Sequence, residues 1–304
     1  MKHLNTNKQF IVHEKQNYVA FFLTFGCNLH CSYCINEHAE SGVKKSSIKT
    51  MSAAEWIRAA DRLVLRDDLP LTLQGGEPTL HKGFYQIVRE VDQQIKMDLL
   101  TNMGFDVEEF IKNVPVWRFD RIAPYAPIRV SYHPGQNDMD DLIVKTLKLL
   151  DKGFRVGIFG INHPNAEINK SVLKAAQKCA EVGIDFRLKE FLGEWNGQLY
   201  GTYKFDGCVS GSDMKSCECR TSEILVNPKG YVFRCHSDLY KNRTPIAHIL
   251  DEEFDPSTLE QFMQCDYYGD CNPCDVKVKT DRFQVFGHTS VEIKNIRQHT
   301  ITNK

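Results

Sequence analysis

The chain has 304 residues, 42% of them apolar, which is enough for one large globular domain and a smaller one. Its 38 basic and 39 acidic residues nearly cancel, so the charge indicates neither a nucleic-acid partner nor a membrane surface. The start of the chain has no segment of membrane-spanning length and no secretion signal. Eleven cysteines in such a chain favour metal ligation in a reducing compartment, so we expect a cytoplasmic protein.

Short β-rich runs alternate with amphipathic helices between residues 18 and 193. The runs span 18–26, 69–75, 97–102, 128–133, 155–162 and 184–191. The first helix begins with a capping box of Ser52 and Glu55, and Gly153 ends a later helix. Six strand–helix units in series predict an α/β fold with a parallel sheet, and six units rather than eight predict a partial (β/α)6 barrel of the TIM type.

One face of nearly every predicted strand carries polar residues towards its carboxyl end. In chain order these residues are Thr24, Gln74, Asn102, Ser131 with His133, Asn162, and Arg187 with Lys189. The alternate residues, such as Leu73 and Leu188, are apolar and should pack against the helices. The polar face should then line the barrel mouth, where βα-loops build active sites, and it predicts a hydrophilic substrate.

The loop after the first predicted strand carries Cys27, Cys31 and Cys34, a CxxxCxxC run with Tyr33 before its third cysteine. Three thiolates on one loop can hold three irons of a cubane cluster while the fourth iron keeps an open position. An open iron can bind and cleave a ligand, whereas a four-cysteine site only stores or passes electrons. Zinc sites and disulfides also use close cysteines and are the alternatives to this interpretation.

This cysteine run, together with Gly75, Gly76, Glu77 and Pro78, resembles the radical S-adenosylmethionine (SAM) superfamily. The resemblance implies the partial barrel and a [4Fe–4S] cluster whose open iron chelates SAM. It also implies one-electron cleavage of SAM to a 5'-deoxyadenosyl radical, and a flavodoxin or ferredoxin-type reductant. The positions that match the family imply SAM contacts from Tyr33, Gly75, Gly76, Glu77, Asn102, Ser131 and Asn162.

A second cysteine-rich region follows a segment rich in Gly, Ser and aromatic residues, which predicts a linker or a lid over the mouth. In this region, two β-rich arms around residues 227–230 predict a hairpin that ends at Cys235. A short helix with a Ser257 and Glu260 capping box leads to the last cysteines. Cysteines that flank a hairpin are well placed to hold a metal.

The spacing from Cys217 or Cys219 to Cys235, and the Cys271–Cys274 pair, resemble the twitch and SPASM auxiliary-cluster domains found behind some radical SAM barrels. The resemblance implies one auxiliary [4Fe–4S] cluster held by Cys219, Cys235, Cys271 and Cys274, with Cys217 able to replace Cys219. The full two-cluster SPASM pattern expects CxxC-x5-C-x3-C and a later cysteine, whereas this chain has C-x5-C-x2-C and none after Cys274, so the resemblance supports one auxiliary cluster and leaves a second one open. A tetrahedral zinc site and buried thiols remain as alternatives.

Three cysteines stand outside this scheme. Cys208 and Cys265 stay unassigned, whereas Cys179 repeats the apolar face of its predicted helix and should belong to the core. The expected organisation is a polar extension over 1–17, the barrel over 18–193, the linker or lid over 194–216, a small cysteine-rich α+β auxiliary-cluster domain over 217–295, and a polar tail over 296–304.

The most chemically capable side chains near the predicted mouth are Gln74, His133, Arg187, Lys189 and Glu190. A buried lysine or histidine among them could serve as a base after hydrogen abstraction. Each could equally be a solvated or ion-paired side chain.

The resemblance leaves two enzymatic hypotheses. The first is an oxidoreductase that abstracts hydrogen from a polar small molecule such as a sugar, an aminoglycoside or a nucleoside, with the auxiliary cluster as electron acceptor. The second is a peptide-modifying enzyme, although residues 1–17 are too few for the winged-helix domain with which many such enzymes bind leader peptides. Outside enzymes, an iron–sulfur electron-transfer or sensor protein would cleave no SAM on reduction.

Overall fold

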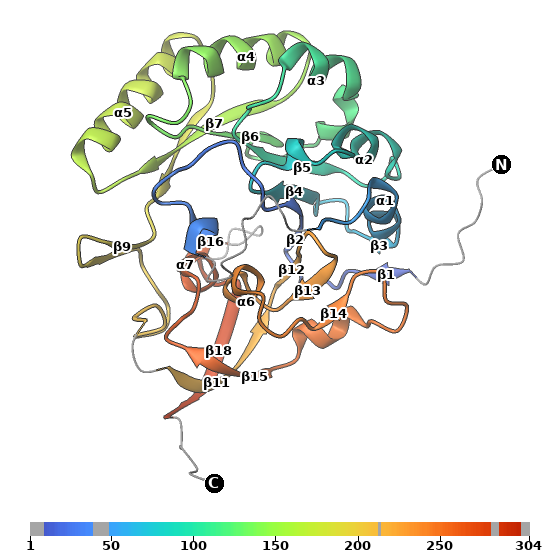
Figure 1. Ribbon diagram of the computed structural model, residues 1–304, viewed down its shortest axis with the longest axis vertical. Helices are drawn as coiled ribbons and strands as arrows, with labels where there is room; N and C mark the ends of the chain where they lie inside the picture. Colours follow the sequence, from blue (N-terminus) through green and yellow to red (C-terminus); the bar gives the residue numbers. More distant parts are fainter. Residues whose placement is uncertain (1–8, 39–48, 212–213, 281–285, 299–304) are drawn as a thin grey trace, which may run out of the picture.

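The computed structural model describes residues 9–38, 49–211, 214–280 and 286–298 (Figure 1). Six parallel strands form the barrel, namely β2 (Tyr18–Thr24), β4 (Leu71–Gly75), β5 (Met97–Thr101), β6 (Ile128–Ser131), β7 (Val156–Asn162) and β8 (Phe186–Glu190). The helices on their outer face are α1 (Ala53–Asp61), α2 (Phe84–Glu90), α3 (Val107–Asn113), α4 (Met139–Asp151) and α5 (Ala166–Glu181). The predicted partial barrel is therefore confirmed.

The local signals of the sequence explain where these helices begin and end. Ser52 and Glu55 form the predicted capping box at α1, with the Ser52 hydroxyl accepting from the Glu55 N–H. After α4, Gly153 adopts a φ of +86°, a left-handed conformation that only glycine enters without strain. Short 3₁₀ turns complete the barrel at η1 (Ile35–His38), η3 (Pro78–Leu80) and η4 (Val116–Phe119).

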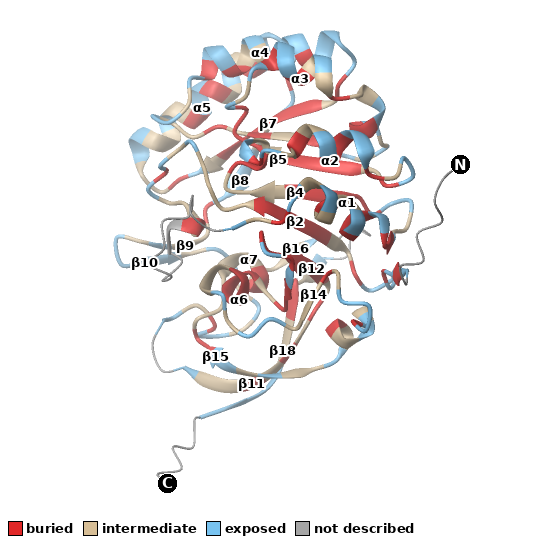
Figure 2. Ribbon diagram, turned by 45° about the vertical axis from the view of Figure 1, so that its right-hand side comes forward, coloured by how far each residue is buried: buried red, intermediate tan, exposed pale blue. Residues whose placement is uncertain are grey.

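The main core lies between the sheet and these helices. Leu23, Leu73 and Val130 are fully buried there with Trp56 of α1, as the alternation of the strands predicts. Burying each such side chain contributes about 1.5–3 kcal/mol to folding. Figure 2 shows the buried strands β2 and β4 beneath helices whose outer faces are exposed.

Leu188 is a correction to the predicted pattern. It was expected under the helical layer, but its side chain is 49% exposed. The reason is that β8 forms the edge of the sheet and the chain then leaves into a hairpin, β9 (Gly193–Trp195) and β10 (Gln198–Tyr200), rather than into another helix. Phe186, at the start of β8, still packs against the core.

The chain after residue 214 both extends the barrel sheet and builds a second, separate sheet. Strand β12 (Glu223–Val226) pairs in parallel with β2, and β13 (Tyr231–Phe233) and β14 (Ala247–His248) follow, which gives nine strands in the order β14-β13-β12-β2-β4-β5-β6-β7-β8. The predicted hairpin around 227–230 joins β12 to β13 and is confirmed. Its pairing with the barrel was not predicted, and the expected domain boundaries stay a prediction.

A three-stranded antiparallel sheet, β15-β11-β18, completes this region with β11 (Lys215–Thr221), β15 (Met263–Tyr268) and β18 (Val291–Arg297). Two short helices, α6 (His236–Lys241) and α7 (Pro273–Val276), lie between it and the barrel (Figure 1). Smaller strand pairs are β1 (Phe10–Ile11) with β3 (Leu63–Val64), and β16 (Lys279–Thr280) with β17 (Phe286–His288). This small α+β region carries the second group of cysteines, as predicted.

The helix expected before Cys265 is another correction. Residues Pro256–Glu260 form a single 3₁₀ segment, η5, and its N-cap is Asp255 rather than Ser257. The carboxylate of Asp255 accepts from both the N–H and the hydroxyl of Ser257. Because the Ser257 hydroxyl donates to the Asp255 carboxylate, Ser257 does not act as the N-cap of a helix.

Candidate functional site

The three cysteines of the CxxxCxxC run lie on the loop that leaves β2. The Leu29 N–H donates to Cys27 Sγ over 3.4 Å, and the Cys34 N–H donates to the Cys31 carbonyl over 3.1 Å. The loop after β6 supports them from the other side, because the His30 N–H donates to Gln136 Oε1 over 2.9 Å. The local turns therefore hold three cysteine side chains on one loop at the carboxyl end of the barrel.

The two glycines after β4 let the cysteine loop lie directly on the end of that strand. The Gly76 N–H donates to the Thr24 carbonyl, and the Glu77 N–H donates to the Gly26 carbonyl, each over 2.8 Å. A Cβ atom on Gly75 would stand 2.0 Å from the Thr24 oxygen, and one on Gly76 would stand 2.2 Å from the Gly26 oxygen. Only glycine fits at either position.

Glu77 does not reach an open cavity. Its residue is fully buried, and its carboxylate accepts from the Thr79 N–H and hydroxyl, the Thr101 hydroxyl (2.8 Å) and the Asn102 N–H (2.7 Å). Burial raises the pKa of this carboxyl, while the four donors oppose that rise. Glu77 thus links the ends of β4 and β5, and both of its carboxylate oxygens already accept hydrogen bonds from residues that the structure describes.

Asn102 connects the end of β5 to the cysteine loop. Its Nδ2 lies 2.8 Å from Asn28 Oδ1 and 3.6 Å from Cys27 Sγ, and its Oδ1 accepts from the Gly104 N–H. The side chain predicted to contact SAM is therefore directed towards the sulfur that would ligate the cluster.

Tyr33 and His133 meet at the mouth of the barrel. The Tyr33 hydroxyl lies 3.1 Å from His133 Nδ1, and the Tyr33 ring also packs against His163. Burial, helped by the charge of Lys189, lowers the pKa of His133 to about 4. A neutral His133 can accept the hydrogen bond from Tyr33, so two residues predicted for different roles form one unit.

Lys189, Asn162 and Glu190 line a common hollow of about 340 Å³ beside β8. Lys189 keeps exposed surface because β8 is the edge strand, although its ammonium lies 4.9 Å from the centre of the Phe159 ring. Desolvation of this group, together with the charge of Arg129, lowers the pKa of Lys189 to about 8. Glu190 lies 3.9 Å from the ammonium of Lys277.

Arg187 does not line the hollow that Lys189, Asn162 and Glu190 share. Its guanidinium donates to the Asp185 carboxylate over 2.9 Å and to the Pro124 carbonyl over 2.6 Å, both on segments that precede strands. The ion pair explains the side chain without a substrate, although the backbone position has the predicted parity. Ser131 ends β6 as predicted, and its carbonyl accepts from Asn137 Nδ2 over 2.9 Å.

Gln74 is a predicted site residue whose side-chain amide nitrogen, Nε2, is buried without a hydrogen-bond partner among the described residues. A buried donor without a partner costs about 1–3 kcal/mol, so such groups usually have a ligand or water in the working protein.

The second group of cysteines surrounds a small cavity beside α6. Its lining includes Cys217, Cys219, Cys235, Cys265 and Cys271. The sequence assigns Cys265 no role, but in the structure this residue lies directly opposite Cys217 across the β11–β15 pair. The C-x5-C-x2-C spacing at the end of the chain was the signal that could have included it.

Cys274 lies outside the lining of this cavity. It faces a larger chamber, whereas Cys271 lines both spaces. Cys208 is buried against Cys217 and accepts the Cys271 N–H at its carbonyl over 2.9 Å. Cys179 is fully buried in the barrel core, as predicted.

The larger chamber, of about 390 Å³, lies between the two groups of cysteines. Tyr33 of the first cysteine loop forms one wall, and Tyr240 of α6, with Cys271 and Cys274, forms the other. Trp195, from the segment predicted as a linker or lid, also lines it. Sequence reasoning missed Trp195 and Tyr240 as lining residues, because nothing in their local pattern says which cavity they border.

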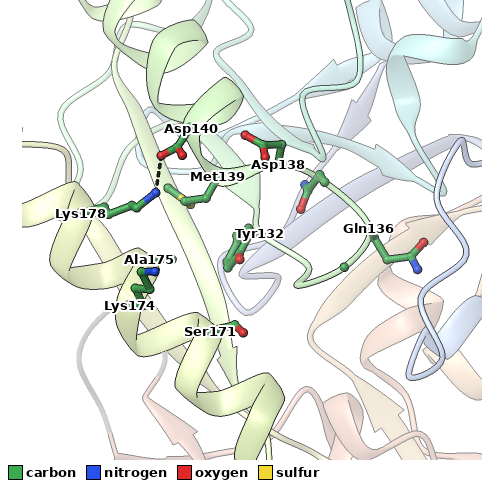
Figure 3. Close-up of a pocket in the computed structure, with 11 residues that line it drawn as sticks. Tyr132, Gln136, Asp138, Met139, Asp140, Ser171, Lys174, Ala175 and Lys178 are labelled. Atoms are coloured by element: carbon green, nitrogen blue, oxygen red, sulfur yellow. Dashed lines mark hydrogen bonds and ion pairs between the residues drawn. The ribbon is translucent and has the colours of Figure 1, made fainter.

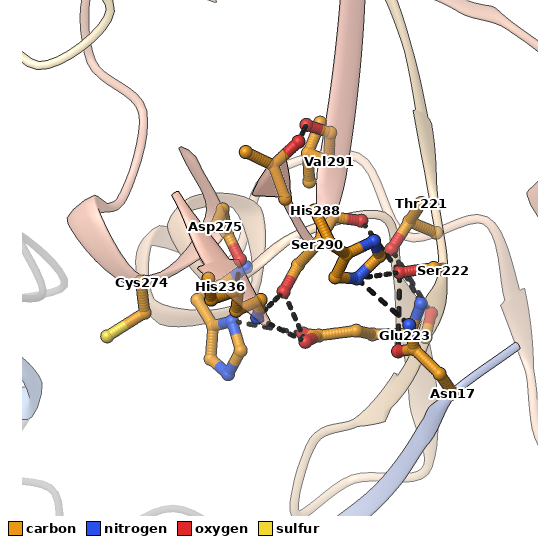
Figure 4. Close-up of polar contacts among 12 residues, drawn as sticks. Asn17, Thr221, Ser222, Glu223, His236, Cys274, Asp275, His288, Ser290 and Val291 are labelled. Atoms are coloured by element: carbon orange, nitrogen blue, oxygen red, sulfur yellow. Dashed lines mark hydrogen bonds and ion pairs between the residues drawn. The ribbon is translucent and has the colours of Figure 1, made fainter. Parts of the chain in front are cut away.

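A polar network lies beside the chamber, at the start of α6 (Figure 4). His236 donates from its N–H and places its Nδ1 2.7 Å from Asp275, while Lys279 lies 3.2 Å from Glu223. One ligand atom each from Glu223, His236 and Asp275 would fall within 4.8 Å of the others. Since Lys279 and Ser290 already bind Glu223, this is an ion-pair network rather than a metal centre.

Another hollow, of about 540 Å³, lies elsewhere, between α4 and α5 (Figure 3). Gln136, Tyr132 and an ion pair of Asp140 with Lys178 border it. It contains no cysteine and is open to the surface, so the chemistry described above does not belong to it. No helix in the described part of the chain is long and apolar enough to cross a membrane.

Comparisons with known proteins agree with this arrangement. The chain is 30% identical over 121 residues to a GTP 3',8-cyclase of Mannheimia succiniciproducens, which covers 39% of this chain and 34% of that protein. It is 39% identical over 66 residues to the sporulation killing factor maturation protein SkfB of Bacillus subtilis, covering 22% and 15%. The matches to three GTP 3',8-cyclases span 34–44% of the length of those proteins.

Among solved structures, the fold resembles anSMEcpe with bound AdoMet and the Kp18Cys peptide, with a TM-score of 0.52 and 15% identity over 81% of this chain and 80% of that one. At this identity the likeness concerns the fold alone. The sequence model of the Radical SAM superfamily matches residues 21–188. This match covers more than half of the chain and coincides with the barrel and its cysteine loop, and the chain therefore belongs to the radical SAM superfamily.

Proposed function

We propose that this protein cleaves SAM reductively at a [4Fe–4S] cluster held by Cys27, Cys31 and Cys34, and uses the adenosyl fragment to abstract hydrogen from a substrate. The observation that carries the proposal is the cysteine loop itself, three sulfur ligands set on the end of β4 by Gly76. Three thiolates fit the cluster and leave one iron open. When bound, the cluster supplies the electron that breaks the sulfonium bond of SAM.

The protein's own residues would bind and orient SAM around this loop. Gln74 offers its unpartnered Nε2 inside the barrel, and Asn36 offers a buried Oδ1 without a partner among the described residues. Tyr33 presents its ring at the chamber wall. Glu77 acts indirectly, because its carboxylate holds the Asn102 N–H and its own N–H holds the Gly26 carbonyl. A one-electron donor of the flavodoxin or ferredoxin type is the partner that the reaction requires.

The chamber supports a small, polar substrate of the sugar, aminoglycoside or nucleoside type. Its volume of about 390 Å³ lies in the range of small-molecule sites, which is about 300–1,000 Å³. The Trp195 and Tyr240 rings give flat apolar walls for a ring, and Lys241 and Asp270 give polar contacts. The partial similarity to GTP 3',8-cyclases, whose name indicates a nucleotide, points the same way.

Modification of a peptide is the second candidate. The observation that favours it is the similarity to SkfB, which is named as a maturation protein and is the relative with the higher identity over its short match. A single side chain of a peptide would also fit the chamber. The two candidate functions make different predictions: a small polar molecule should increase SAM turnover in the first, and a peptide should increase it in the second.

Lys189 is the residue we propose as the base. With its pKa at about 8, a useful fraction of its amine is neutral near pH 8 and can accept the proton that an oxidised carbinol loses. Its hollow adjoins the chamber, since Phe191 lines both, and it also contains Asn162 and Glu190, which could hold hydroxyl groups of a substrate that extends from the chamber. We assign Arg187 no role in this step, because its guanidinium is engaged with Asp185.

The second cavity supports an auxiliary [4Fe–4S] cluster that accepts the electron of the oxidation. Cys219, Cys235 and Cys271 line it together, which matches three of the four proposed ligands. Cys274 stays the proposed fourth ligand and Cys217 stays the alternative to Cys219, and we add Cys265 as a further candidate because it lines the same cavity. Zinc at this site would contradict the electron-accepting role, since zinc has no redox chemistry.

Metal analysis tests the two clusters together. Wild-type protein reconstituted anaerobically should hold about eight irons, and the Cys27→Ala/Cys31→Ala/Cys34→Ala variant about four, because the two cysteine groups are independent. Serine at Cys271 should also leave about four irons. Serine at Cys179, a cysteine buried in the core, should leave iron content unchanged. Zinc in place of the remaining iron in the triple variant would overturn the auxiliary cluster.

The substrate class can be tested by measuring 5'-deoxyadenosine with and without candidate compounds. Sugars, aminoglycosides and nucleosides with deuterium at their carbinol positions should raise turnover and transfer deuterium into 5'-deoxyadenosine. If only peptides raise turnover and acquire the modification, the small-molecule assignment is wrong and the peptide assignment holds.

A further inference from the structure

A buried arginine lies at the wall of the second cysteine cavity. Arg234 directly follows β13, is only 7% exposed and lines the cavity with the thiols of Cys219 and Cys265. Its Nε and Nη2 donate to Asp238 Oδ2 over 3.1 and 2.7 Å, and its Nη1 donates to the Gln264 carbonyl over 2.7 Å. With the residues that the structure describes, these contacts use three of its five N–H groups.

Burying this arginine needs a physical reason, because charged side chains are rarely inside a protein unless they are paired. Asp238 balances it, but a buried ion pair roughly breaks even against apolar residues of the same volume. A cluster held by four thiolates adds negative charge to the same cavity. The Asp238 N–H also donates to Cys235 Sγ over 3.4 Å, so the ion pair and the sulfur ligands form one assembly.

We propose that Arg234 and Asp238 are positioning residues that set the reduction potential of the auxiliary cluster, Arg234 raising it and Asp238 lowering it. This inference rests on the auxiliary cluster of the proposed function. Reduction adds one electron to the cluster, so a fixed positive charge nearby stabilises the reduced state and a fixed negative charge opposes it. The guanidinium thereby favours acceptance of the single electron that a deprotonated substrate radical gives up.

Arg234 and Asp238 carry opposite charges, so their replacement should shift the reduction potential of the auxiliary cluster in opposite directions, and the test compares these directions. The background is the full chain with Cys27, Cys31 and Cys34 replaced by alanine, so that the auxiliary cluster gives the only iron–sulfur signal. Redox titration with dithionite, followed by electron paramagnetic resonance, measures the ratio of reduced to oxidised cluster. Iron content and melting temperature are recorded for every variant.

Arg234→Gln should lower this ratio at least tenfold at a fixed potential, which corresponds to about 59 mV for one electron. Asp238→Asn should raise it, because the guanidinium then stands without its counter-charge. The double variant should return towards the starting value. Arg220→Gln is the matched control. Arg220 lies on the face of β11 opposite to the neighbouring Cys219 and pairs with Glu292 at 2.7 Å. Its replacement should not change the ratio of reduced to oxidised cluster.

The possible failures are distinguishable. If the background variant holds no iron, the auxiliary cluster of the proposed function is wrong and this inference falls with it. If iron is retained but Arg234→Gln and Asp238→Asn shift the ratio in the same direction, or neither shifts it, only the role of the ion pair is overturned. If Arg234→Gln does not fold, the upward shift expected for Asp238→Asn still decides the matter.

Discussion

Gly76 gives the sharpest test of how the fold builds the cysteine loop. Its φ is not positive, so alanine would meet no backbone strain there, and only space opposes the substitution. An added Cβ would stand 2.2 Å from the Gly26 oxygen, whereas an ordinary van der Waals contact begins near 3.4 Å. The difference between these two values, about 1.2 Å, is the distance by which the cysteine loop or the end of β4 must move.

We expect Gly76→Ala to keep the fold and lose the chemistry. Overpacking of this kind costs typically about 1–3 kcal/mol, which corresponds to a fall in melting temperature of several degrees. A displacement of about an ångström at the reacting centre can cost on the order of a hundredfold in rate. SAM cleavage by the reconstituted variant should therefore fall about a hundredfold, while about four irons remain at the auxiliary site.

Gly183→Ala is the matched control for this variant. Gly183 has a φ of +73° and open space around its Cβ position, so the cost of alanine there is backbone strain alone. The control should lose about 1–2 kcal/mol of stability without any change in SAM cleavage. Wild-type cleavage by Gly76→Ala at full iron content would refute the claim that close backbone contact positions the loop.

Three further predictions concern the barrel. Asp98 is fully buried and binds Arg121 bidentately at 2.7 Å, so Asp98→Ala should cost about 3–5 kcal/mol in urea unfolding; a loss below about 1 kcal/mol would count against the pair. The rate of substrate turnover should fall as the pH drops below about 8, because protonated Lys189 cannot act as a base, and Lys189→Arg should remove this dependence along with most turnover. Leu188→Ala should leave the melting temperature nearly unchanged, whereas Leu73→Ala should cost about 2–5 kcal/mol; equal losses would contradict the edge position of β8.

The sequence predicts most of the barrel because its local signals agree with one another. Alternating strands, the Ser52 cap and the Gly153 stop each favour the same element at the same place, and the structure confirms them. The three cysteines of the first loop are adjacent in the chain, so local spacing is enough to group them. The glycines at 75 and 76 follow the same rule, since their role depends on one neighbouring strand.

Long-range pairing explains what the sequence did not predict. Cys265 meets Cys217 through a strand register set across 48 residues, and no local pattern encodes that register. The pairing of β12 with β2 joins segments about 200 residues apart. Arg187 shows a second reason why side-chain roles are hard to predict from sequence. The alternation of the strand predicts on which face the residue starts, but it does not predict that the guanidinium binds the nearby Asp185 carboxylate.

The most direct test of the central claim is the formation of 5'-deoxyadenosine by the purified protein. Anaerobically reconstituted wild-type protein, given a reductant and SAM, should form 5'-deoxyadenosine and methionine in equal amounts. Alanine at Cys27, Cys31 and Cys34 should abolish both products while the auxiliary iron is retained, because the cluster that breaks the sulfonium bond then has no sulfur ligands. Unchanged product formation by this variant would contradict the assignment of the first cysteine loop as the site of SAM cleavage.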